Sequence, residues 1–180
     1  LIPTMHHVRM VQGCYIDILN GKVEQVSADL YVSPGGNNLN SGLIPEEPLQ
    51  TIYWANTKIL ADSIHPYTIH LLSGIYSPSN NDEFFCINMP SYVSLKHWGD
   101  GAAILDAEQS GRVILMVNNV GSIISGLNIK GGISSHEASG ILIINSNPLI
   151  QNVVICDNMS RIYGSAIFCS NSSPIIVNST

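Results

Sequence analysis

The C-terminal part of the sequence repeats itself at a fixed spacing of 26 residues. Residues 141–152 read ILIINSNPLIQN and residues 167–178 read IFCSNSSPIIVN, so apolar residues, asparagines and a proline coincide after a shift of 26. The same shift backwards places Leu115 opposite Ile141 and Ile123 opposite Leu149. A constant period in this range indicates stacked structural units, each too small to bury a core alone.

The residues within each repeat favour strands over helices. The segments are short and rich in Ile, Val and Leu, and Asn, Ser, Gly and Pro separate them, which is typical of strands joined by tight turns. A leucine-rich repeat would instead keep Leu at fixed positions and add a helical half. We therefore predict an all-β fold, a right-handed single-stranded parallel β-helix with coils of about 26 residues.

One column of asparagines is expected to mark a corner of these coils. Strands stacked in register place equivalent residues about 4.8 Å apart. The shift of 26 aligns Asn119, Asn145 and Asn171, which we interpret as a structural ladder. Inward-turned amides at a bend would also satisfy backbone groups that the bend leaves unpaired.

The composition fits a solenoid and disfavours two classes of partner. Charged residues make up only 11% of the chain, as in turns built from uncharged polar residues. The 7 basic residues are scattered and the net charge is −6, so nucleic acid is not expected as a partner. No apolar run approaches the roughly 20 residues of a transmembrane helix, and no signal peptide is recognisable at the first residues.

The repeat divides the chain into two parts. Residues 1–29 lack it and contain strand-like segments around Asn20-Gly21, so we interpret them as a hairpin in a linker or in the tail of a preceding module. Residues 30–180 are assigned to the β-helix domain. Within it, apolar residues recur every three or four positions from about 48 to 65, which predicts a helix that caps the first coil.

The last strand of the sequence stops without a visible polar cap. A solenoid needs such a cap, because an uncovered coil exposes both core and backbone edge. We therefore expect the domain to be C-terminally truncated at Thr180, with further β-helix coils of a longer chain as its partner there.

The sequence supplies no convincing metal site, so no cofactor is expected. His6 and His7 are adjacent and would point to opposite sides of a strand. The turn around Asn38, Asn40 and Gly42 resembles a calcium loop in spacing but has no carboxylate, and calcium prefers charged oxygen ligands.

The cysteines do not reveal the redox compartment. None has metal-ligand spacing, and two interpretations remain open, small buried hydrophobic residues or one disulfide. The residues concerned are Cys14, Cys86, Cys156 and Cys169.

Several motifs in a fixed order resemble a known family. They read LYVSPGGNNLNSG at 30–42, PLQTI at 48–52, IHLLSGIYS at 69–77, MPSYVSL at 89–95 and ILD at 104–106. This resembles the DUF1565 family, which is grouped with the pectin-lyase-like right-handed parallel β-helices. The resemblance implies a secreted or cell-surface bacterial module, similar in fold to polysaccharide lyases and glycoside hydrolases. It supplies no catalytic motif for numbered positions here, and fold alone does not fix function.

A catalytic site would need acids stacked on neighbouring coils, because glycosidases use two carboxyl groups roughly 5–10 Å apart. No acid repeats at the period. If Leu105 stacks below Ile129, then Asp106, Lys130 and Cys156 share one column. Asp106 and Lys130 could be a base and its partner in β-elimination, or a surface ion pair, which is the simpler interpretation.

Three functions remain open at this point. The first is a non-catalytic module that binds carbohydrate or a surface protein, with Trp98 as the candidate binding residue, since sugars stack on exposed aromatic rings. The second is part of a polysaccharide lyase or glycoside hydrolase whose active residues lie elsewhere. The third is a passive spacer.

Overall fold

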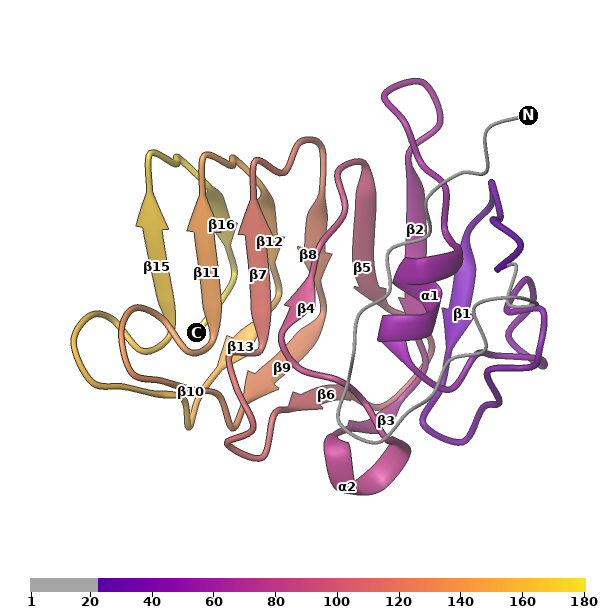
Figure 1. Ribbon diagram of the computed structural model, residues 1–180, viewed down its shortest axis with the longest axis horizontal. Coiled ribbons are helices and arrows are strands. Elements are labelled where there is room, and N and C mark those ends of the chain that lie inside the picture. The colour runs from indigo at the N-terminus through magenta and orange to yellow at the C-terminus, as the bar shows by residue number, and fades with distance from the viewer. Residues whose placement is uncertain (1–22) are drawn as a thin grey trace, which may run out of the picture.

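The chain forms a parallel β-solenoid of about four turns, as predicted (Figure 1). The structure, a computed structural model, describes residues 23–180. Three parallel sheets form the walls of the solenoid, and each full coil contributes one strand to each sheet. The hairpin expected before residue 30 falls mostly outside the described residues, as do His6, His7 and Cys14.

The three walls are named here sheets I, II and III. Sheet I comprises β1 (Leu30–Val32), β2 (Tyr67–Leu71), β5 (Val93–His97), β8 (Ile123–Ser125), β12 (Leu149–Gln151) and β16 (Ile175–Val177). Sheet II comprises β3 (Gly74–Tyr76), β6 (Ala103–Asp106), β9 (Leu127–Lys130) and β13 (Val154–Ile155). Sheet III comprises β4 (Ile87–Asn88), β7 (Ile114–Val117), β11 (Ile141–Ile144) and β15 (Ile167–Ser170). A separate pair joins β10 (Ile133–Ser134) to β14 (Met159–Ser160), and the helices are α1 (Ile52–Lys58) and α2 (Pro78–Asn81).

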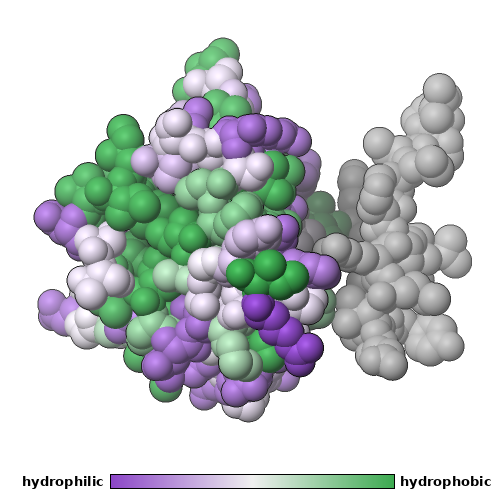
Figure 2. Space-filling view, turned by 90° about the vertical axis from the view of Figure 1, so that its left-hand side faces the viewer, coloured by the Kyte–Doolittle hydropathy of each residue, from purple (hydrophilic) through white to green (hydrophobic). Residues whose placement is uncertain are grey.

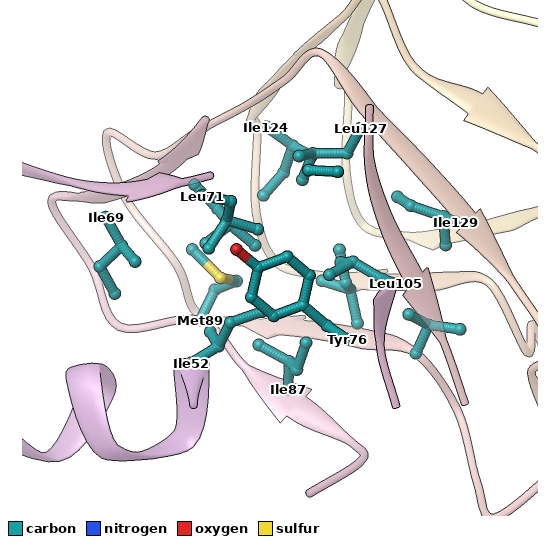
Figure 3. Close-up of a cluster of buried hydrophobic side chains, with 14 of the residues drawn as sticks. Ile52, Ile69, Leu71, Tyr76, Ile87, Met89, Leu105, Ile124, Leu127 and Ile129 are labelled. Atoms are coloured by element: carbon teal, nitrogen blue, oxygen red, sulfur yellow. The ribbon is translucent and has the colours of Figure 1, made fainter. Parts of the chain in front are cut away.

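The core is a column of aliphatic side chains enclosed by the sheets (Figure 3). Residues of a strand point alternately into the core and to the surface. Because the coils stack in register, the core positions of successive coils lie above one another along the solenoid axis. Tyr76 is the largest fully buried side chain, and its hydroxyl lies 2.8 Å from the Val32 carbonyl and 2.7 Å from that of Leu72. Burial raises the pKa of Tyr76, so the phenol remains protonated.

The expected asparagine ladder is wrong by one residue at its first position. Strands β7 and β11 pair Ile114 with Ile141, an offset of 27, whereas β8 and β12 keep the offset of 26. The turn after β7 therefore contains one residue more than the turn after β11. As a result Asn118, not Asn119, stacks on Asn145, and the Asn145 Nδ2 donates to the Asn118 Oδ1 at 3.0 Å.

The ladder is also exposed rather than inward-turned, and its backbone conformation explains the residue type. Asn118, Asn145 and Asn171 have φ of 51°, 50° and 49°, in the left-handed region that Asn tolerates better than most residues. The buried polar groups of this corner belong to the next residue in each coil, which includes Asn119, 3% exposed.

Ser146 shows how the corner is satisfied. Its buried hydroxyl accepts a hydrogen bond from the backbone N–H of Asn119 at 2.8 Å and donates to the carbonyl of Ile144 at 2.7 Å. One coil later, Ser172 accepts from the Ser146 N–H at 3.1 Å and donates to the Ser170 carbonyl at 2.7 Å. Each corner side chain thus bonds its own coil and the neighbouring coil.

Two other corners use the same arrangement. Ser179 accepts from the N–H of Val153 at 3.2 Å, and Asn158 accepts from the N–H of Gly132 at 2.8 Å. Both also donate to the carbonyl two residues before them. In each case a residue with positive φ precedes the corner side chain, namely Asn145, Asn171, Asn178 and Asp157 for Ser146, Ser172, Ser179 and Asn158.

The predicted helix is shorter than expected and ends at Lys58 rather than near residue 65. Thr51 caps its N-terminus by accepting from the Trp54 N–H at 3.2 Å. Ile59 leaves the helix to form a parallel bridge with Val26. Asp62 then accepts from two backbone N–H groups of the following turn, a local arrangement that competes with helix continuation.

The helix covers one edge rather than the whole first coil. Asn56 donates to the carbonyl of Asn88, so α1 lies beside β4 at the end of sheet III (Figure 1). The outer edge of β1 is covered by the loop that follows it, because the backbone groups of Tyr31 bond Gly42 at 2.7 Å and Leu49 at 2.9 Å. Helix and loop therefore share the capping function.

Buried Glu83 fixes α1 to the solenoid. Its carboxylate accepts from the backbone N–H groups of Ile52 at 2.7 Å, Tyr53 at 3.0 Å and Phe84 at 3.2 Å. Burial raises the pKa of Glu83 to about 7, although each of these hydrogen bonds lowers it.

The opposite end of the solenoid exposes apolar side chains (Figure 2). In sheet I, Ile124 and Ile150 are fully buried, whereas Ile176, the equivalent residue of β16, is 48% exposed. Among residues 23–180, no helix is long and apolar enough to cross a membrane.

We predict that Ser146→Ala lowers the free energy of unfolding by about 1–3 kcal/mol, because the buried Asn119 N–H loses its partner. Chemical denaturation measures this change. The matched control is Ser173→Ala, since Ser173 is exposed and its loss should change stability by less than about 0.5 kcal/mol. Equal effects of the two substitutions would contradict the corner account.

Glu83 predicts a specific dependence of stability on pH. The pKa is raised in the folded protein, so between about 4.5 and 7 the unfolded chain ionises while the folded chain keeps its proton. Stability should therefore fall as the pH rises through this window, by an amount on the order of 3 kcal/mol. Denaturation at pH 5 and pH 8 should show this fall in the wild type, weakened in Glu83→Gln. The exposed Glu46→Gln should retain the fall, and an unchanged fall in Glu83→Gln would refute the assignment.

Candidate binding site

Three aromatic side chains gather on the outer surface of the first coils. Tyr31 and His70 are register partners in β1 and β2, and their rings stack with centroids 4.9 Å apart and planes at 22°. Trp98 follows β5 directly and meets both rings edge-on, at 5.0 Å from His70 and 5.6 Å from Tyr31. We call these residues the aromatic cluster. Trp98 is 45% exposed, so part of the indole remains available to a ligand.

Hydrogen bonds fix the cluster to the solenoid. Asp29 Oδ2 lies 3.0 Å from His70 Nε2, and Asp29 Oδ1 accepts from the Thr68 N–H at 2.8 Å. The backbone N–H of Trp98 donates to the Leu71 carbonyl at 2.8 Å, which fixes the backbone of Trp98 at the end of β5. The His70 ring is therefore held by a hydrogen bond, and the other two rings pack against it.

Polar side chains lie next to the aromatic cluster in the sequence and in the register of sheet I. Lys96 is the register partner of His70 on the next coil. Ser73 bonds His97 Nε2 at 3.1 Å and also the backbone carbonyl of Asp100. A partly exposed aromatic ring with polar residues at neighbouring positions suits a ligand with apolar ring faces and polar edges.

Sequence reasoning identified Trp98 but missed its two aromatic neighbours. His70 lies on the outer face of its strand, because Ile69 and Leu71 point into the core. Its contact with Tyr31 depends on a register offset of 39 residues between β1 and β2, which the repeat does not contain. Predicting this contact would have required knowledge of the pairing between β1 and β2.

The structure brings Asp106 and Lys130 together on the surface of sheet II. They are register partners, and Lys130 Nζ lies 2.9 Å from Asp106 Oδ2. The hydrogen bond with Asp106 raises the pKa of Lys130, so the amine stays protonated. A protonated amine cannot abstract a proton, so Asp106 is the member of this ion pair that could act as a base.

The interpretation of the cysteines as buried hydrophobic residues is wrong for two of them. Cys156 and Cys169 are exposed, and Cys86 is partly buried. All three are free thiols in the part of the chain that the structure describes. Cys156 follows the stacked residue Ile155 and so continues the column of Lys130.

The turn that resembles a calcium loop is held by its own amides. Asn38 Oδ1 accepts from the backbone N–H groups of Gln50 at 3.0 Å and Thr51 at 3.1 Å, and Asn40 Nδ2 donates to the Pro48 carbonyl at 2.9 Å. Across residues 23–180, no three His, Cys, Asp or Glu side chains lie close enough to hold a metal ion.

Comparison with known proteins adds no relative to this picture. No protein-family model matches the chain, and no significant match is found among curated proteins or solved structures.

Proposed function

We propose that this solenoid is a non-catalytic binding module that recognises carbohydrate through the aromatic cluster. The observation that carries the proposal is the half-exposed indole of Trp98, held edge-on against His70 and Tyr31. Sugar rings present axial C–H groups to aromatic faces and hydroxyls to their edges, and the cluster offers both kinds of contact. A protein partner with an exposed ring would use the same surface, and the binding test separates the two.

We further propose that the module acts in a secreted or cell-surface setting and is related to the DUF1565 family. The motif order from residue 30 to residue 106 and the parallel solenoid support this relationship. We also propose that a further β-helix coil packs on the end of the solenoid formed by β15 and β16. Ile176 supports this, because it is exposed whereas the equivalent residues of earlier coils are buried.

An enzymatic role is the second candidate, and only the Asp106–Lys130 pair favours it. The raised pKa of Lys130 argues against a role as base. A lyase assay that follows the absorbance of unsaturated uronate decides this point. If the protein forms product and Lys130→Met does not, the enzymatic proposal replaces the binding proposal. If no uronate polymer gives product, the result supports a binding function alone. Failure of both tests would leave a passive spacer.

Trp98→Ala should weaken glycan binding by about tenfold or more, since loss of an aromatic stacking contact removes on the order of 1.4 kcal/mol. A glycan array identifies the ligand, and calorimetry then compares the variants. Tyr163→Ala is the matched control, because Tyr163 is a 58% exposed aromatic residue outside the cluster. Binding unchanged in Trp98→Ala, or weakened equally in Tyr163→Ala, would contradict the proposal.

A further inference from the structure

A second concave site lies between α1 and β4, apart from the aromatic cluster. It is a groove of about 230 Å³. Every residue that lines it is uncharged, and those used below are Tyr53, Asn56, Thr57, Phe84, Cys86 and Asn88. Ile87 also lines the groove and belongs to the buried cluster of Figure 3.

Two aromatic rings form one wall of this groove. Tyr53 and Phe84 meet edge-on with centroids 5.8 Å apart and planes at 65°, and they are 40% and 41% exposed. The backbone N–H groups of both residues donate to the same oxygen, Oε1 of buried Glu83. One carboxylate therefore fixes two rings that are 31 residues apart in the chain, so the wall is preformed.

The groove also offers uncharged polar groups. Asn56 Nδ2 donates to the Asn88 carbonyl at 3.2 Å, while its Oδ1 is shielded from water and accepts no hydrogen bond from residues 23–180. An unpaired buried acceptor is costly, so a ligand hydroxyl that reached this oxygen would be stabilised by it. The Thr57 hydroxyl already bonds the Tyr53 carbonyl at 2.9 Å, which leaves its oxygen free to accept.

We infer that this groove binds a single uncharged sugar ring, a neutral hexopyranose unit. The aromatic wall matches the apolar face of such a ring, and the amide and hydroxyl acceptors match its hydroxyl donors. The volume lies below the roughly 300–1,000 Å³ of sites for larger ligands, so it takes one ring. The inference uses none of the residues of the aromatic cluster and stands without it.

Cys86 provides a direct readout, because its thiol lines the groove while Cys156 and Cys169 lie elsewhere and are exposed. The chain is alkylated with iodoacetamide, and each cysteine-containing peptide is followed by mass spectrometry. Methyl β-glucopyranoside or methyl β-galactopyranoside at about 100 mM should slow alkylation of Cys86 at least about threefold, since occupancy excludes the reagent by mass action. The rates at Cys156 and Cys169 should not change.

Variants separate this site from the aromatic cluster. Tyr53→Ala removes half of the wall and should abolish the protection of Cys86, with circular dichroism and the unfolding midpoint confirming the fold. Trp98→Ala should retain the protection. The inference is overturned if neither glycoside protects Cys86, or if protection persists in folded Tyr53→Ala.

Discussion

The solenoid depends on how its corners satisfy the backbone. A chain that turns at every few residues leaves N–H groups pointing into the core, and an unpaired buried N–H costs about 1–3 kcal/mol. Here a left-handed residue turns the chain, and the next side chain accepts an N–H from the preceding coil, as Ser146 does for Asn119 and Ser172 does for Ser146. Because each bond spans two coils, it fixes their register as well as their bend. Aliphatic residues can then stack on themselves without a gap.

The regular and the irregular coils have different roles. From β8 onward every strand pairs with its equivalent in the next coil at an offset of 26 residues. The first coils contain longer connections, and these place Tyr31 and Trp98 beside His70 and bring α1 against β4. Buried Glu83 joins α1 to the solenoid by accepting hydrogen bonds from the N–H groups at the N-terminus of that helix. Both proposed binding surfaces therefore lie where the repeat is interrupted, on a scaffold that the repeat makes rigid.

The period and the strand-rich composition were sufficient to predict the parallel solenoid, because register follows directly from a fixed spacing. They misplaced Asn119, since one additional residue in the turn before β8 is invisible to a search with a constant shift. A better signal was present in the sequence, namely an Asn or Asp followed by Ser or Asn, as at Asn171-Ser172 and Asp157-Asn158. The helix end and the aromatic cluster could not be predicted, because they depend on pairings outside the repeat, such as the bridge of Ile59 to Val26.

Hydrogen exchange of individual backbone amides tests the corner arrangement most directly. The N–H groups of Asn119, Ser146, Val153 and Gly132 lie in turns, yet each donates to a side chain of the next coil. We expect these amides to exchange as slowly as those of the adjoining strands, since they open only when coils separate. Exchange at the rate of exposed turns would show that the corners do not hold the coils together.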